Sequence, residues 1–320
     1  MNKLVTIFAL LVMLSACGGA PKQAEAVEEA PKQAIPEGAI PMHYDRHLCL
    51  EVELSDSIAT RMLFDTGNTH LLLDSTFYAE KIGDRVPLMR SMFGGAGDGM
   101  ESARMAMHAW HYRLGKEEMT ERMAVVMNLR KIVGEKADGM VGMTLMQGRR
   151  VLLDYRDGYM QLLAASDSIP RDFVKIPCAW LDDTKMRLVM PLEVAFGDGS
   201  TFKGNFLVDT GMPDALSLNS TTAEHLNLKS RIPNAVRRER AVGGVGGASV
   251  EYEFTAKTIT VGGVVRHDIE ATWSENRQGS LADTRYDGLV GNALLENFDV
   301  IFDFSSCAIY LRENEYTSVV

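Results

Sequence analysis

The chain has 320 residues with a net charge of −10, from 43 acidic and 33 basic residues, and this balance argues against a general nucleic-acid binder. Its apolar fraction of 46% is that of an ordinary globular protein. The length provides for one large domain or for two lobes with cores of their own.

The N-terminus predicts export and attachment to a membrane. Leu4–Met13 is apolar but too short to span a bilayer, so residues 1–17 are interpreted as a signal peptide. Its last four residues, Leu14 to Cys17, resemble a bacterial lipobox, which predicts lipidation of Cys17; an ordinary signal peptide with an incidental cysteine is the simpler alternative. Gly18 follows that cysteine, where an Asp is associated with inner-membrane retention in some bacteria. We therefore expect a lipid anchor in the outer membrane of a bacterial cell envelope, on its periplasmic or its outer face.

Residues 18–36 are rich in Ala, Pro, Lys, Gln and Glu and contain few bulky apolar side chains. Such a segment cannot bury enough surface to offset its ordering entropy. We expect a flexible tether.

The first half of the remaining chain contains a short alternating run, Leu50–Leu54, and then Asp65-Thr66-Gly67 after an apolar run. Asp74-Ser75-Thr76 predicts a helix start because these side chains cap free amides. A glycine-rich turn at 94–99 predicts a hairpin tip. Asp138–Gly142 and a closing strand at Val151–Tyr155 complete this half.

His108 and His111 invite a metal interpretation. They lie in Met105–Leu114, which alternates like a strand, so residues three apart are expected on opposite faces. No zinc-like spacing occurs elsewhere, and we predict no metal site.

The second half repeats these features. A strand is expected at Leu192–Phe196, followed by Asp209-Thr210-Gly211, 144 residues after the first triplet. Thr221 and Glu224 have capping-box spacing. The glycine run at 243–247, the segment Asp287–Gly291 and the strand Val300–Phe304 all follow their counterparts by 149 residues. The constant offset predicts two equivalent lobes, residues 37–168 and 169–320, mostly of short strands with a few short helices.

The spacing excludes a βαβ array, because regular helices do not separate the strands. The glycine run at 243–247 lacks the Lys-Ser/Thr of a phosphate-binding loop, and no Gly-x-Ser-x-Gly elbow supports a serine hydrolase. Besides Cys17, three cysteines remain, so at most one disulfide forms among Cys49, Cys178 and Cys307; buried structural thiols are the alternative.

The duplicated pattern resembles retropepsin-like aspartic proteases. The resemblance rests on an apolar pair before Asp-Thr-Gly, a glycine-rich hairpin, and two apolar residues before a glycine. It covers nearly all of the chain after residue 37. It implies an all-β, bilobal aspartic-protease-like fold in which one chain supplies both half-sites, as in the pepsin family, and therefore a monomer.

The resemblance also implies residue roles. Asp65 and Asp209 would be the catalytic pair, and Thr66 and Thr210 would hold the two loops together by reciprocal hydrogen bonds. Gly67 and Gly211 would let the backbone turn beside the carboxylates. The hairpins would be flaps over an extended peptide or protein substrate; their candidate glycines are Gly94, Gly95, Gly97, Gly243, Gly244 and Gly246.

Two carboxylates sharing one proton can act together as general base and general acid on a peptide bond, without a cofactor. Two residues depart from the family, which commonly places Ser or Ala after the triplet: here they are Asn68 and Met212. The Ser that is usual in the family can hydrogen-bond a catalytic carboxylate, and without it we do not expect activity at strongly acidic pH. The rival hypothesis is a peptide- or protein-binding lipoprotein that keeps the fold without turnover, and a weaker one is a structural envelope protein.

Overall fold

The computed structural model describes residues 34–241 and 243–314. The predicted signal peptide, Cys17 and most of the tether lie outside the described residues. Within the described part of the chain, no helix is both long and apolar enough to cross a membrane.

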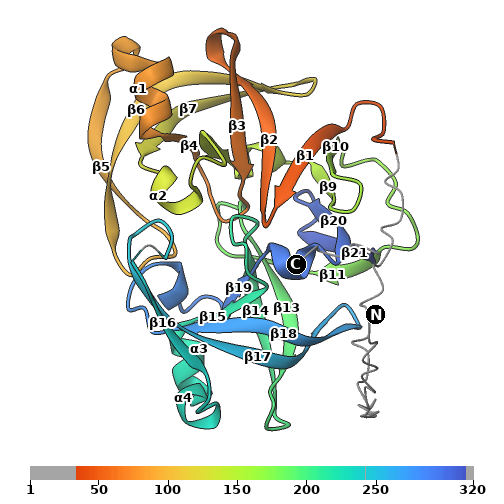
Figure 1. Cartoon of the computed structure of the whole chain (residues 1–320). Coiled ribbons are helices and arrows are strands. Elements are labelled where there is room, and N and C mark those ends of the chain that lie inside the picture. The colour runs from red at the N-terminus through yellow and green to blue at the C-terminus, as the bar shows by residue number, and fades with distance from the viewer. Residues whose placement is uncertain (1–33, 242, 315–320) are drawn as a thin grey trace, which may run out of the picture. The chain divides into compact units, whose positions relative to one another are not determined.

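The first half of the described chain is built mainly from strands (Figure 1). Its strands are β1 (Ile40–Asp45), β2 (His47–Leu54), β3 (Ile58–Phe64), β4 (Leu71–Asp74), β5 (Leu88–Gly94), β6 (Met100–Leu114), β7 (Glu117–Met127), β8 (Gly139–Val141), β9 (Arg150–Asp154) and β10 (Tyr159–Leu163). Its helices are α1 (Ser75–Lys81) and α2 (Arg130–Val133), with short 3-10 helices at Ser55–Ser57, Gly83–Arg85 and Met143–Met146.

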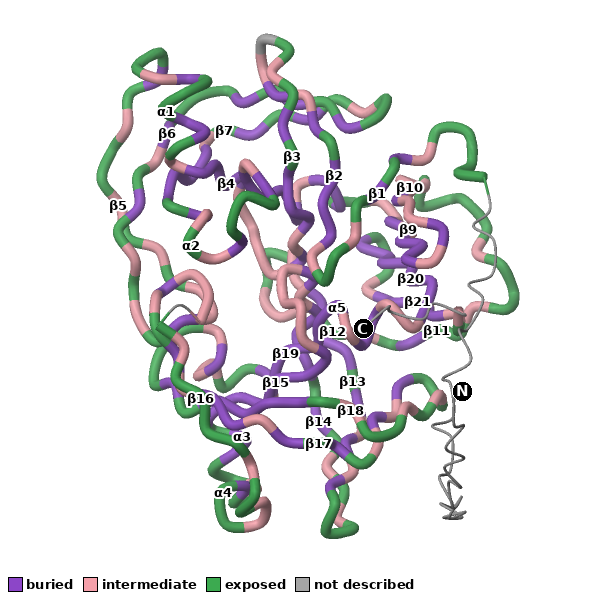
Figure 2. The backbone as a smooth tube through the Cα atoms, in the orientation of Figure 1, coloured by how far each residue is buried: buried purple, intermediate pink, exposed green. Residues whose placement is uncertain are grey.

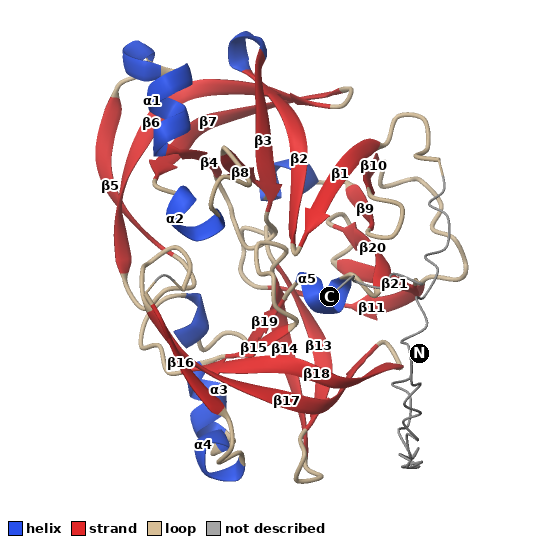
Figure 3. Cartoon of the chain, in the orientation of Figure 1, coloured by secondary structure: helices blue, strands red, loops and turns tan. Residues whose placement is uncertain are grey.

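The second half has the same character (Figure 3). Its strands are β11 (Val174–Pro177), β12 (Ala179–Trp180), β13 (Leu188–Ala195), β14 (Thr201–Val208), β15 (Leu216–Leu218), β16 (Val236–Arg240), β17 (Ser249–Val261), β18 (Val264–Ser274), β19 (Gly288–Val290), β20 (Phe298–Asp303) and β21 (Ala308–Glu313). Its helices are α3 (Ser220–His225), α4 (Leu228–Arg231) and α5 (Asn292–Leu295), with a 3-10 helix at Ser280–Ala282.

The two lobes share one strand order, which confirms the all-β bilobal fold. In the first lobe the order is β2-β3-β8-β4-β7-β6-β5, and in the second it is β13-β14-β19-β15-β18-β17-β16. In both lobes, the strand that leads into the triplet runs parallel to a short apolar strand that ends just before a glycine, Gly142 or Gly291. β3 pairs with β8, and β14 pairs with β19. The strands expected around Leu50–Leu54 and Leu192–Phe196 are present as β2 and β13.

A central antiparallel sheet joins the lobes, in the order β11-β21-β20-β9-β10-β1. At its middle the two closing strands β9 and β20 pair with each other, and Leu152 faces Ile301. These two residues are equivalent by the 149-residue offset, so the local two-fold relation between the lobes passes between them.

Buried apolar side chains form one large cluster that draws on both lobes, including Phe64 and Tyr155 from the first and Phe206 and Phe302 from the second. In Figure 2 buried segments run through the middle of the body, while hairpins and turns are exposed. The core therefore fixes the two triplet loops from beneath.

The alternation predicted for Met105–Leu114 fails at a β-bulge between Met107 and Trp110. The bulge turns both His108 and His111 toward solvent, because the extra residues break the two-residue period. His111 Nδ1 lies 3.0 Å from Thr120 Oγ1.

The helix caps differ between the lobes. Asp74 caps α1 as predicted, accepting hydrogen bonds from the Thr76 and Phe77 amides. The capping box predicted for Thr221 and Glu224 is wrong: α3 begins at Ser220 after Asn219, and no side chain caps it. The side-chain amide of Asn219 instead donates through Nδ2 to the Asp283 and Tyr286 carbonyls.

Candidate active site

The two Asp-Thr-Gly loops begin in the same way. Each Asp follows directly on a buried strand, and its amide donates to the last residue of the parallel neighbour. Asp65 N bonds Val141 O and Asp209 N bonds Val290 O, both at 2.9 Å. Strand pairing inside each lobe therefore fixes the backbone position of each aspartate.

The glycines after Val141 and Val290 leave room for these loops. A Cβ atom on Gly142 would lie 2.2 Å from Asp65 O, and one on Gly291 would lie 2.5 Å from Met212 O. Any side chain there would push the triplet loop away from the strand beneath it.

Two threonines join the loops across the lobes, with the reciprocal contacts that the resemblance implies. Thr66 N donates to Thr210 Oγ1 and Thr210 N donates to Thr66 Oγ1, both at 3.0 Å. Thr66 Oγ1 donates to Val208 O at 2.7 Å, and Thr210 Oγ1 donates to Phe64 O at 2.9 Å. Both threonines are buried, so each hydroxyl satisfies a donor and an acceptor that water cannot reach.

Asp65 and Asp209 are face to face, because each carboxyl group lies beside the triplet glycine of the opposite loop. A Cβ on Gly67 would lie 3.0 Å from the Asp209 carboxyl, and one on Gly211 would lie 2.6 Å from the Asp65 carboxyl. The glycines thus allow the closest approach of each loop to the opposite carboxylate. Both aspartates remain partly accessible to solvent.

Backbone amides hold one oxygen of each carboxyl. Asp65 Oδ1 accepts from Gly67 N at 2.7 Å and from Asn68 N at 3.1 Å, while Asp209 Oδ1 accepts from Gly211 N at 2.9 Å. These bonds fix the rotamers and leave the outer oxygens for a third molecule.

The pair holds a proton more tightly than an isolated carboxyl does. Burial raises the pKa of Asp65 well above its ordinary value, and the neighbouring charge of Asp209 raises it further. Burial also raises the pKa of Asp209. Because the two groups interact strongly, the titration belongs to the pair.

The two unusual residues, Asn68 and Met212, make contacts within their own lobes. The Asn68 side chain closes its own loop, with Nδ2 donating to His70 O and Oδ1 accepting from His70 N. Met212 packs against a small buried cluster that contains Leu207, Tyr286 and Leu289. Neither residue offers a hydroxyl to the aspartates.

The two glycine-rich hairpins meet at their tips (Figure 1). Gly97 N donates to Val245 O at 2.9 Å and Asp98 N donates to Ala248 O at 2.8 Å. A Cβ on Gly97 would lie 2.4 Å from Gly246 C, so only glycine permits this contact. Of the six candidate flap glycines, Gly94 ends β5, and Gly95, Gly97, Gly243, Gly244 and Gly246 lie in the two tip loops.

The first tip also docks on the second lobe. Asp98 Oδ1 accepts from Arg277 N at 2.6 Å and from Gln278 N at 2.8 Å. Asn276 Nδ2 donates to Ala96 O at 2.9 Å. The structure is therefore one with the hairpins closed.

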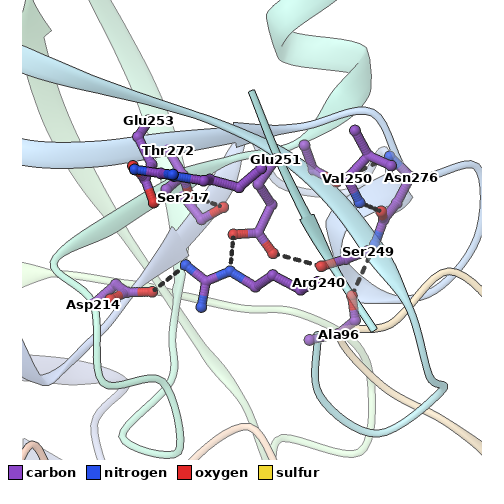
Figure 4. A network of polar contacts seen from close by, with 12 residues as sticks. Ala96, Asp214, Ser217, Arg240, Ser249, Val250, Glu251, Glu253, Thr272 and Asn276 are labelled. Carbon is purple, nitrogen blue, oxygen red and sulfur yellow. Dashed lines mark hydrogen bonds and ion pairs between the residues drawn. The ribbon is translucent and has the colours of Figure 1, made fainter. Parts of the chain in front are cut away.

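Figure 4 shows a charged group that links the second hairpin to the loop after the second triplet. Arg240, the last residue of β16, lies between Asp214, at 3.9 Å, and the buried Glu251, at 3.2 Å. Ser249 Oγ donates to Glu251 at 2.7 Å. Asp214 also pairs with Arg46 of the first lobe at 3.3 Å.

Sequence reasoning missed Asn292, which directly follows Gly291. It is fully buried, and its Nδ2 donates to Thr210 O at 2.7 Å and to Arg46 O at 3.1 Å. Its Oδ1 accepts from Tyr155 OH at 2.8 Å. The signal available in the sequence was a polar residue where the first lobe has Met143.

Other candidate sites in the described part of the chain have less structural support. No group of three or more His, Cys, Asp or Glu side chains within 34–241 and 243–314 is arranged to hold a metal ion. A surface cavity of about 280 Å³ contains neither Asp65 nor Asp209 in its lining. Arg61, which lines it, is paired with Glu51.

Comparison with known proteins agrees with this geometry. The sequence model of the aspartyl protease family matches residues 192–294, which contain the second triplet, the second hairpin and the segment Asp287–Gly291. Among solved structures, the chain is similar to the aspartic proteinase from Irpex lacteus. The TM-score is 0.54 at 13% identity, over 88% of this chain and 98% of that one.

The chain has the aspartic-protease fold. This likeness shows the fold. A search of curated proteins finds no matching sequence.

Proposed function

We propose that the protein is an aspartic endopeptidase whose catalytic residues are Asp65 and Asp209. The observation that carries the proposal is the close approach of two carboxyl groups from equivalent loops of the two lobes, each beside the triplet glycine of the other loop. Thr66 and Thr210 support it by holding the loops in register.

The chemistry follows from the shared proton. The ionised carboxylate takes a proton from a water molecule, and the protonated one donates toward the carbonyl oxygen of the scissile bond. This division of roles between two close carboxyl groups is the general behaviour of aspartic protease pairs. The raised pKa values of the pair keep that proton in place above strongly acidic pH. We therefore propose a working range from mildly acidic to neutral.

The substrate we propose is a peptide or protein segment in extended form, bound between the carboxyl pair and the two hairpins. Because the tips are joined through Gly97 and Val245, they have to separate before a chain can enter. No cofactor takes part. One chain supplies both half-sites, which supports a monomer as the active form.

The test is digestion of a peptide library by the full chain between pH 4 and pH 8, with and without pepstatin. D65N and D209N should each abolish cleavage, whereas D84N should not. Asp84 is an exposed carboxylate of the 3-10 helix Gly83–Arg85. Cleavage by either dyad variant at the wild-type rate would refute the shared mechanism. Peptide binding without cleavage at any pH would favour the binding-protein alternative.

We also retain lipid attachment at Cys17, and with it an outer-membrane location, as a proposal. Mass spectrometry of the N-terminal peptide from cells should find a diacylglycerol-modified Cys17, and C17S should remove the protein from the membrane fraction. An unmodified Cys17 in membrane-free protein would contradict the anchor.

A further inference from the structure

Two cysteines of the second half stand opposite each other at the edge of the central sheet. The ladder between β11 and β21 ends with Pro177 facing Ala308, so the next pair is Cys178 and Cys307. Cys178 N donates to Cys307 O at 3.4 Å, which continues the antiparallel pairing.

This register suits a disulfide. Cys178 and Cys307 lie just beyond the last pair of the ladder, and a backbone hydrogen bond of this kind holds two Cα atoms about 5.5 Å apart. Disulfides bridge Cα separations of about 4.4–6.8 Å. Burial is the main cause that raises the pKa of Cys178, and the neighbouring Cys307 raises it further.

The third thiol lies elsewhere. Cys49 is buried in a cluster of the first lobe with Leu63 and Leu72, and its Sγ contacts Lys136 O at 3.8 Å. Cys178 and Cys307 are instead half-buried, so a small oxidant can reach them.

The turn itself gives no reason for a cysteine at position 307. Cys307 has φ of 53°, in the left-handed region that glycine or asparagine adopts at lower cost. The backbone conformation therefore does not account for the cysteine at this position.

We propose that Cys178 and Cys307 are a thiol pair that closes to a disulfide by exchange with a small-molecule disulfide such as oxidised glutathione. The Cys307 thiolate attacks one glutathione sulfur, the S–S bond breaks, and one glutathione thiolate leaves. Cys178, after losing its proton, attacks the Cys307 sulfur and releases the second glutathione. Two protein thiols are oxidised, and one glutathione disulfide is reduced to two thiols.

The order of attack follows from the surroundings. Burial raises the pKa of Cys178 to about 12, so its thiolate is scarce. Burial raises the pKa of Cys307 as well, but by less than that of Cys178. Because the thiolate is the nucleophile, Cys307 reacts first and Cys178 resolves the mixed disulfide.

The bond would tie residue 178 to residue 307, and the loop between them contains Asp209 and the second hairpin. A cross-link over so long a loop restricts the unfolded chain strongly. The oxidised protein should therefore unfold at a higher temperature than the reduced one.

The experiment treats the full chain with oxidised glutathione at pH 8.5, blocks remaining thiols, and maps peptides without reduction. Trypsin should release the peptide 176–185 joined to the peptide 286–312. In C178A, Cys307 should carry glutathione, whereas in C307A most of Cys178 should stay unmodified. The matched control C49A should keep both the linked peptides and the oxidation-dependent rise in melting temperature.

Three results would overturn the proposal: wild-type protein without the linked peptides, a link that involves Cys49, or a melting temperature that oxidation raises equally in C178A. Each variant is compared with its own reduced form. A variant that is less stable overall therefore still reports whether oxidation changes it.

Discussion

The hydroxyl contacts between the two triplet loops allow a quantitative prediction for T66V and T210V. Valine keeps the shape of threonine but removes a hydroxyl that makes two buried hydrogen bonds in each case. A buried polar group left without a partner costs about 1–3 kcal/mol. Two such groups predict a loss of about 2–6 kcal/mol in the free energy of unfolding for each variant.

The assay is equilibrium unfolding in urea, followed by the rate of peptide cleavage. T60V is the matched control, because Thr60 is also buried but makes one side-chain bond, to Val52 O at 2.8 Å. It should lose about half as much, roughly 1–3 kcal/mol. The equivalence of the lobes further predicts that T66V and T210V agree to within about 1 kcal/mol.

A loss in T66V or T210V no larger than in T60V would show that these contacts do not hold the lobes together. Strongly unequal losses in the two variants would refute the assumption that both loops are fixed in the same way.

Three further predictions concern the carboxyl pair and the hairpins. Because the folded pKa of Asp65 is raised, its contribution to stability is greatest below its unfolded pKa and is lost as pH rises; D65N should therefore melt above wild type at pH 7, with the difference vanishing near pH 4. D98A removes the carboxylate that accepts from the Arg277 and Gln278 amides. The backbone amides of loop 95–99 should then exchange hydrogen about fivefold faster, which corresponds to a decrease of ~1 kcal/mol in the free energy of local opening. Unchanged exchange would contradict the closed tip. R240A leaves a buried carboxylate with a single donor and should lose about 1–3 kcal/mol in urea unfolding, whereas R238A on the same strand, with an exposed partner, should lose less than about 1 kcal/mol.

Much of the fold followed from local pattern. The triplets, the glycine runs and the closing strands are short signals that recur with a fixed offset, so they predicted two similar lobes. The structure places Asp65 next to Asp209. The resemblance to aspartic proteases predicted this contact, whereas the repeat alone predicted only that the two residues are equivalent.

What the sequence did not predict depends on contacts between distant segments. Nothing near Asn292 indicates that it reaches Thr210 and Arg46, since those partners lie far away in the chain. The bulge after Met107 changes a strand's period within a run that looks regular. The predicted capping box at Thr221 and Glu224 does not form, and the side-chain amide of Asn219, which precedes the helix, donates to the carbonyls of Asp283 and Tyr286.

The register of β9 and β20 shows what a single chain gains over a pair of identical ones. About the Leu152–Ile301 centre, Arg150 faces Asp303 and forms an ion pair at 2.8 Å, while the equivalent contact sets Asp154 against Asp299. Identical subunits would have to repeat one of these contacts on both sides. In the fused chain Arg312 neutralises Asp299 instead. Each half of this molecule is therefore free to specialise, and the two lobes need not present the same chemistry on either side of the Asp65–Asp209 pair.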